Sequence, residues 1–281
     1  KGPGELTELR DFIVMDEKVC ILTYKRILFF NLQGEVLKEV KIKAKDNILN
    51  PMEMTIQREK MIYLWNGTLG ENERGSEIKY TLLGYEIESG KIVSKNFPTN
   101  RYCMAGTYLF PDHNEGSTNI IPLFGHNTIY KLNNDSLYEY LKLNFGRYNL
   151  NSDILNSGFS PDVLQQNLKL RQSDKYNVDI ANFHETDLFY YFTFFHKGKM
   201  KEVLYSKVSD NYILGNANLF TMFNFTYDGY FVSLFEPQYI NLVEKLYLKG
   251  KLTKHNYDIL KNIDKSPDSN PIMLVYEVQE F

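Results

Sequence analysis

The sequence predicts an all-β fold, a β-propeller built from four-stranded antiparallel blades. Aromatic residues make up 15 % of the 281 positions, with 21 Tyr and 19 Phe, and such side chains favour pleated, half-buried surfaces. A short pattern recurs along the chain at intervals typical of propeller blades. An apolar content of 43 % in a chain of this length is also enough to bury a large core.

The recurring pattern marks the third strand of each expected blade. It consists of an aromatic residue, a spacer, an aliphatic residue and a polar turn, which is absent from the last copy. The copies begin 55, 45, 75 and 71 residues apart, and the two long intervals contain helical sequence. Removing about 25–30 residues for each insert brings the period to about 45, the length of a blade. The copies begin at Phe30, Tyr85, Tyr130, Tyr205 and Tyr276.

Both long intervals carry helix signals. Pro161 opens the first helical stretch, and proline favours the first helical position. In the second interval, Ile240, Val243 and Tyr247 share one helical face, and Gly250 is placed to end the helix. Thr253 can cap a further short helix. The two helical insertions are expected near residues 160–172 and 237–263.

Alternation of apolar and polar residues, together with turn residues, places the strands. In the first blade, Val40 and Ile42 alternate with charged neighbours, as in an outer strand with one solvated face. Residues 189–195 are apolar on both faces, which is typical of a middle strand between neighbouring blades; an aromatic platform for a ligand is the alternative. Strands are expected at residues 11–15, 19–24, 27–32 and 36–43; at 52–56, 60–65, 80–87 and 91–97; at 102–110, 119–124, 128–132 and 137–143; and at 222–226, 230–235 and 272–278.

A single propeller domain is expected over residues 1–281. The last copy lacks a fourth strand, and natural proteins avoid a long unpaired apolar edge. The first residues, 1–5, are predicted to form a loop and cannot supply the closing strand. We therefore expect six blades, with the first blade and the closing strand upstream. The five blades within the chain are expected at approximately 5–43, 48–98, 101–145, 176–219 and 220–281.

Three short segments carry a resemblance to a known family. They are Gly2-Pro3-Gly4-Glu5 with the following Leu9-Arg10-Asp11-Phe12, the hairpin Asp228-Gly229-Tyr230-Phe231, and the ending from Asn270 to Tyr276. The chain resembles the six-bladed β-propeller family of Bacteroidetes and is similar in build to NHL-repeat propellers. The resemblance implies a lipoprotein signal upstream and export to the periplasm or cell surface. It implies no reaction and no catalytic residues.

Charge and cysteine content narrow the possible partners. The net charge of −3 and a pI near 6.0 provide no basic footprint for nucleic acid or an anionic membrane. The two cysteines, Cys20 and Cys103, both fall in expected strands, where a thiol behaves as a small apolar group. We expect no disulfide framework and no cofactor.

Motifs for metal binding and nucleophilic catalysis are absent from the sequence. The five histidines are scattered without the spacing of zinc ligands. The loop from Asp112 to Gly116 has alternating oxygen ligands, but Leu123 stands where a calcium loop requires Glu, so a polar hairpin tip is expected. No Gly-x-Ser-x-Gly sequence occurs. The sequence predicts neither a metal site nor a catalytic residue.

A ligand site is expected at a mouth of the propeller channel, where loops from several blades meet. Residues that begin or lead into inner strands are candidates there, because they combine hydrogen-bond donors, acceptors and a ring. The single tryptophan precedes a polar loop and is a candidate for stacking on a sugar or a partner. The candidate residues are Arg10, Asp11, Trp65, Arg101, Tyr102, Asn182 and His184.

Two classes of function remain open. The favoured one is an exported, non-enzymatic binding or scaffolding propeller for a glycan, a peptide or a protein. The alternative is a propeller glycoside hydrolase or lyase, whose carboxylates would come from several blades and lie within about 10 Å. A third possibility is that the inserted helices cover the ring or mediate assembly. Acidic residues available for the alternative are Glu53, Asp179, Glu185 and Asp228.

Overall fold

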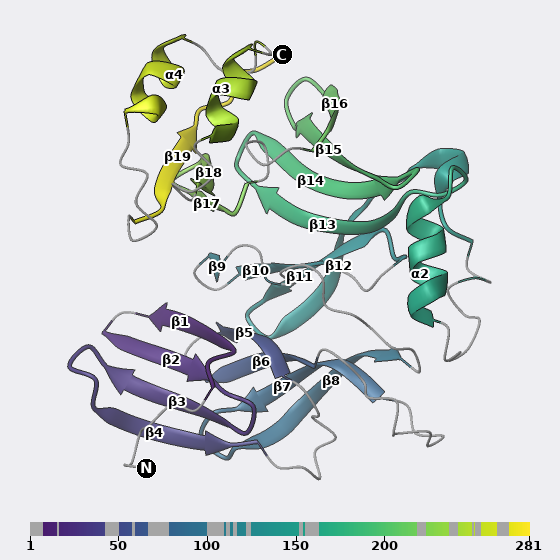
Figure 1. The fold of residues 1–281 in the computed structure, drawn as a ribbon. Coiled ribbons are helices and arrows are strands. Elements are labelled where there is room, and N and C mark those ends of the chain that lie inside the picture. Colours follow the sequence, from purple (N-terminus) through teal and green to yellow (C-terminus); the bar gives the residue numbers. More distant parts are fainter. Residues whose placement is uncertain are drawn as a thin grey trace. The chain divides into compact units, whose positions relative to one another are not determined.

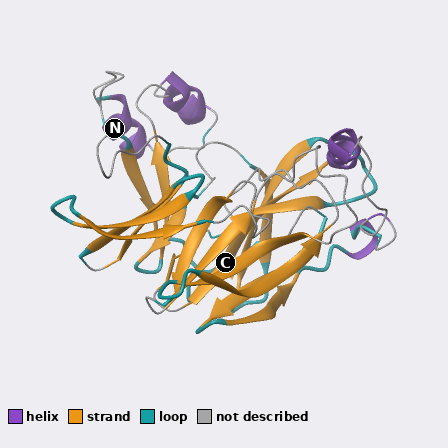
Figure 2. Cartoon of the chain, turned by 90° about the horizontal axis from the view of Figure 1, so that it is seen from below, coloured by secondary structure: helices purple, strands orange, loops and turns teal. Residues whose placement is uncertain are grey.

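The computed structural model confirms an all-β chain with few helices (Figure 2). Five antiparallel sheets are formed by the described residues, four of them four-stranded, which agrees with the predicted blades. None of the described helices is long and apolar enough to cross a lipid bilayer. The residues described are 8–15, 17–42, 51–57, 60–66, 79–99, 110, 113–114, 117–121, 125–151, 154, 163–217, 223–235, 241–248, 250, 254–262 and 270–281.

The chain forms two compact units. The first comprises residues 1–183 and 192–201, and the second comprises residues 184–191 and 202–281. The boundary runs through the fourth sheet, so its first three strands contribute to both units. The three sheets before it belong to the first unit, and the last sheet belongs to the second (Figure 1).

The first two sheets are consecutive meanders that pack on each other. Turn residues separate their strands where expected, and the strand bounds agree with the predictions to within two residues. Ile13, Cys20 and Leu22 of the first sheet share a core with Met54 and Leu64 of the second. The strands are β1 (Asp11–Met15), β2 (Lys18–Leu22), β3 (Arg26–Asn31), β4 (Val36–Lys41), β5 (Pro51–Gln57), β6 (Met61–Asn66), β7 (Lys79–Glu86) and β8 (Lys91–Thr99).

Burial explains the chemistry of Cys20. Its side chain is fully buried, and its thiol contacts the Met54 sulfur at 3.9 Å. Removal from water, with a smaller contribution from the Asp11 carboxylate, raises the pKa of the thiol to about 12. Cys20 therefore behaves as the small apolar group that was predicted. Cys103 lies outside the described residues.

The third sheet departs from its predicted inner strand. Of the predicted strand 102–110, only Phe110 is described, and it is not in a strand. The innermost described strand is His113–Asn114, which pairs with Ser117 and Thr118 in a hairpin. His113 and Asn114, which were expected in a polar hairpin tip, therefore add a short strand to the sheet. Its strands are β9 (His113–Asn114), β10 (Ser117–Ile120), β11 (Thr128–Asn133) and β12 (Ser136–Lys142).

The fourth sheet contains the most aromatic strand. β14 lies between β13 and β15, and its residues 189 and 191–194 are buried, so the middle-strand prediction is confirmed. The predicted helix is present as α2 (Val163–Gln172), and its last turn contacts the β14–β15 turn through a hydrogen bond from Gly198 N to Arg171 O. The strands are β13 (Val178–Glu185), β14 (Phe189–His196), β15 (Lys199–Ser206) and β16 (Tyr212–Asn216).

The last sheet has three described strands, as predicted. Phe223, Phe231 and Tyr276 pack with Tyr191 in an aromatic core. The inserted helices contact each other, and the rings of Tyr247 and Tyr257 stack at 4.3 Å. The elements are β17 (Phe225–Tyr227), β18 (Tyr230–Phe235), α3 (Asn241–Leu248), α4 (Lys254–Lys261) and β19 (Ile272–Tyr276).

Both terminal sheets have apolar side chains on two faces. In β1, Ile13 enters the core while Phe12 and Val14, on the opposite face, are 57 % and 60 % exposed. In β19, Tyr276 enters the aromatic core while Met273 and Val275 are 58 % and 52 % exposed. Interior sheets such as β5–β8 instead contribute residues to two cores.

Candidate ligand-binding site

Two predicted site residues, Arg10 and Asp11, connect neighbouring sheets. Asp11 Oδ2 accepts a hydrogen bond of 2.8 Å from the backbone N of Met54 in β5. The Arg10 guanidinium donates to the sulfur of Met52 at 3.6 Å and pairs with Glu8 at 2.6 Å. These contacts join β1 to β5 and give both side chains a structural role.

Asn182 and His184 do not begin their strand as expected. β13 starts at Val178, so both residues lie in its second half. Asp179 and Asn182, with φ of 62° and 49°, adopt left-handed conformations within the strand. Asn182 Nδ2 donates to Thr193 Oγ1 at 3.3 Å. His184 is buried, and its Nε2 lies 2.9 Å from the Phe223 carbonyl.

Trp65 lies in the core. Its side chain is 2 % exposed and packs with Tyr63, Leu82 and Ile120. Among the described residues the indole Nε1 has no hydrogen-bond partner. Arg101 and Tyr102 lie outside the described residues. Arg10 and Asp11 are neighbours in the chain, and the contacts of the described candidates do not gather them into one site.

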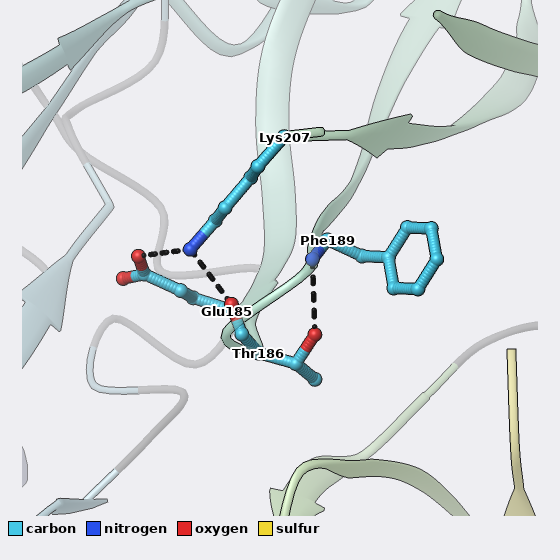
Figure 3. Close-up of polar contacts among 4 residues, drawn as sticks. All are labelled: Glu185, Thr186, Phe189 and Lys207. Atoms are coloured by element: carbon cyan, nitrogen blue, oxygen red, sulfur yellow. Dashed lines mark hydrogen bonds and ion pairs between the residues drawn. The ribbon is translucent and has the colours of Figure 1, made fainter. Parts of the chain in front are cut away.

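A polar and aromatic cluster in the second unit was not predicted as a site. Lys207 follows β15, and its Nζ donates to Glu185 Oε1 and to the Thr186 carbonyl, both at 2.7 Å (Figure 3). The same ammonium lies 4.3 Å from the centroid of the Tyr190 ring. Thr186 Oγ1 accepts from the backbone N of Phe189 at 3.1 Å, which closes the β13–β14 turn. Lys207 is therefore held by a carboxylate, a carbonyl and a ring.

Two tyrosines extend this cluster across adjacent strands. Tyr190 in β14 and Tyr205 in β15 stack with centroids 5.9 Å apart and an interplanar angle of 27°. The Tyr205 hydroxyl donates to Asp210 Oδ1. This hydrogen bond, more than burial, raises the pKa of Tyr205 above its ordinary value. We call Glu185, Tyr190, Tyr205, Lys207 and Asp210 the Lys207 cluster.

The turn that carries the Lys207 cluster is fixed by its own hydrogen bonds. The buried Ser206 hydroxyl accepts from the backbone N atoms of Val208 and Ser209 and donates to Glu280. Lys207 N donates to the Leu188 carbonyl at 2.8 Å. The side chains of the cluster are thus held in place while Tyr190, Tyr205 and Lys207 remain partly exposed. A fixed and accessible arrangement loses little entropy when a ligand binds.

Two of the acidic residues available for the catalytic alternative, Glu185 and Asp179, are engaged in ion pairs. Glu185 pairs with Lys207, and Asp179 pairs with Arg171, whose guanidinium also lies 4.9 Å from the Phe195 ring centroid. Burial raises the pKa of Asp179, and Arg171 partly offsets this effect. Asp228 occupies the β17–β18 turn. The described residues contain no group of three or more His, Cys, Asp or Glu that could hold a metal ion.

Replacing Asp179 by Asn should change how stability depends on pH. A carboxyl whose pKa is raised by folding stabilises the fold while protonated, and this contribution is lost as pH rises from below its unfolded value through its folded value. We expect the free energy of unfolding of the natural chain to fall relative to Asp179→Asn over this window. Urea titrations across acidic pH measure this difference in the free energy of unfolding. Arg171→Gln should enlarge the fall in stability, because Arg171 lowers the pKa of Asp179. A rise in the stability of the natural chain relative to Asp179→Asn with rising pH would contradict a raised pKa for Asp179.

Comparisons with known proteins support the architecture. Residues 1–231 match a family model described as a 6-bladed beta-propeller. A candidate exported protein from Bacteroides fragilis NCTC 9343 has a similar structure, with a TM-score of 0.66 and 14 % identity over 100 % of this chain and 80 % of that chain. At this identity the likeness concerns the fold alone. No curated protein matches the sequence.

Other solved structures are more distant. The Pan2 WD40 domain of Neurospora crassa has a TM-score of 0.31 and 7 % identity over 77 % of this chain and 67 % of that chain. The Pyrococcus horikoshii acylaminoacyl peptidase has a TM-score of 0.32 and 9 % identity over 78 % and 40 %. Neither similarity is strong enough to carry an argument about function.

Proposed function

Because the chain belongs to the 6-bladed beta-propeller family whose model matches residues 1–231, we propose that it is an exported binding protein without catalytic activity. Its ligand is held at the Lys207 cluster on the fourth sheet. One observation carries this proposal: stacked tyrosines and a fixed lysine share a partly exposed surface. Rigid aromatic side chains beside a few oriented polar groups are typical of binding sites.

The ion pairs favour binding over hydrolysis. A glycoside hydrolase needs one carboxylic acid to donate a proton and a second carboxylate to act as nucleophile or base. Glu185 is instead neutralised by Lys207 at 2.7 Å, and Asp179, despite its raised pKa, faces Arg171. Both carboxylates therefore organise neighbouring side chains.

Export is supported by the sequence resemblance and by the Bacteroides fragilis relative, which is described as a candidate exported protein. Attachment as a lipoprotein at the periplasm or cell surface is part of the same proposal and rests on the resemblance alone. Fractionation of cells that carry the natural gene tests both points. Recovery of the protein from the cytosol would contradict export.

Ligand binding by the residues expected at the channel mouth stays a prediction. Arg10 and Asp11 contact residues of β5, and His184 contacts the Phe223 carbonyl before β17, which accounts for their identities without a ligand. The proposal therefore rests on the Lys207 cluster, where the side chains contact one another and remain partly exposed.

Binding and turnover can be tested in one experiment. We expect the intact chain to bind a member of a panel of oligosaccharides and extended peptides, measured by calorimetry, and to release no product on chromatography. Lys207→Gln should weaken binding because it removes the contacts that the ammonium makes with Glu185 and Tyr190, whereas Lys199→Gln, at the exposed start of β15, should not. Product formation, or binding equally affected by both variants, would overturn the proposal.

A further inference from the structure

The Tyr205 ring is the most suitable stacking surface in the Lys207 cluster. It is partly exposed, and the one ring that packs on it among the described residues is that of Tyr190. Tyr190 in turn contacts the Lys207 ammonium. No other ring of the described residues packs on the second face of Tyr205. The negative face of an aromatic ring attracts C–H groups of partial positive charge, such as those on the flat face of a pyranose.

Asp210 supplies hydrogen-bond acceptors at the edge of this ring. Its carboxylate is exposed and accepts from the Tyr205 hydroxyl through Oδ1. An ionised carboxylate has two oxygens and several acceptor positions, so it can accept further hydrogen bonds from a ligand. The ligand must then supply hydrogen-bond donors to Asp210 and a C–H face to the Tyr205 ring. A molecule with hydroxyl groups beside a C–H face meets both requirements.

The charges of the cluster favour a neutral ligand. The one ammonium, on Lys207, already contacts Glu185 and the Thr186 carbonyl, and the pair is partly buried. Asp210 adds a further negative charge beside the stacking ring. An anionic ligand would be repelled by Asp210 and would have to compete with Glu185 for the lysine.

The position of Tyr205 disfavours an extended peptide. β15 is an interior strand that pairs with β14 on one side and β16 on the other (Figure 1). A peptide that adds a strand to a sheet needs unpaired backbone groups at an edge. Side-chain stacking and hydroxyl recognition remain as the means by which this surface can bind.

We propose that the Lys207 cluster binds a neutral saccharide, with one sugar ring stacked on Tyr205 and its hydroxyl groups donating to Asp210. This inference rests on the proposed binding function and specifies its ligand class. Tyr190 and Lys207 act as positioning residues, since the Tyr190 ring packs on Tyr205 and the Lys207 ammonium lies against the Tyr190 ring.

The experiment uses neutral oligosaccharides of glucose, galactose and mannose as probes, with uronic-acid oligosaccharides and extended peptides as comparators. We expect binding by a neutral probe, and we expect Tyr205→Ala to weaken it about tenfold, the effect of losing one stacking contact. Tyr205→Phe should retain most of the affinity, because it keeps the ring. Asp210→Ala should weaken binding by removing the acceptor. Circular dichroism checks that each variant folds.

Tyr227→Ala is the matched control, because Tyr227 is a tyrosine of β17, in another sheet, with 69 % exposure and should not affect binding. Selective binding of uronic-acid oligosaccharides or peptides that depends on Lys207 would overturn the saccharide assignment and leave the binding function intact. Neutral-saccharide binding that Tyr205→Ala leaves unchanged would overturn the site. Absence of binding to every probe would overturn the proposed function itself.

Discussion

Trp65→Ala is expected to lower the free energy of unfolding by about 3–5 kcal/mol, the usual cost of truncating a large buried aromatic side chain. The ring is 2 % exposed and packs with Tyr63, Leu82, Ile120 and Leu132, so its removal leaves a cavity between the second and third sheets. Urea unfolding followed by circular dichroism measures the change, because the variant loses the only tryptophan.

Two further variants test the assignment of Trp65 to the core. Trp65→Phe should cost less, about 1–2 kcal/mol, because it retains much of the packing and removes an indole N–H that has no partner among the described residues. Tyr212→Ala, at a 65 % exposed ring, should change stability by less than about 0.5 kcal/mol. If Trp65→Ala behaved like Tyr212→Ala, the ring would belong to an accessible surface and the predicted stacking role would regain support.

Phe231→Ala, in the second unit, is expected to lower the free energy of unfolding by a similar amount, about 3–5 kcal/mol. Phe231 is 1 % exposed, stacks on Phe223 at 4.6 Å and contacts Tyr191 at 6.1 Å. Aromatic pairs add about 0.5–1.5 kcal/mol each beyond burial. Hydrogen exchange measured by mass spectrometry should therefore accelerate in β17–β19.

The adjacent residue provides the control for this prediction. Tyr230 lies on the same strand, points to the opposite face and is 39 % exposed. Tyr230→Ala should leave exchange in β17–β19 nearly unchanged. Exchange in β5–β8 serves as an internal reference, because the described ring contacts of Phe231 are all with residues of the second unit. Equal acceleration by the two variants would contradict the aromatic core.

Much of the fold could be predicted because strand signals are local. Alternation and turn residues placed β1–β4 and β5–β8 to within two residues. The apolar run at residues 189–195 identified a strand buried on two faces. The predicted resemblance to a six-bladed β-propeller family is confirmed by the match of residues 1–231.

The candidate site was harder to predict because its contacts are not local. Lys207 and Glu185 are 22 residues apart, and their contact depends on how β13 and β15 flank β14. Tyr205 was recognised only as a repeat position and Asp210 only as part of a polar turn. The useful signal was a polar turn with the charged residues Lys207 and Asp210 directly after the aromatic repeat position Tyr205. Arg10 and Asp11 were expected at a ligand site, but sequence alone does not show that β5 provides their partners.

The exposed apolar side chains of β1–β4 have a consequence for cooperativity. In repeat architectures, stability is approximately the sum of each repeat's own contribution and the contributions of its contacts with neighbours. The β5–β8 sheet contributes residues to two of the described cores, whereas β1–β4, with Phe12 and Val14 exposed, contributes to one of them. In residues 1–281 by themselves, thermal fluctuations should therefore open β1–β4 more often than β5–β8, so that local unfolding of this part starts in β1–β4.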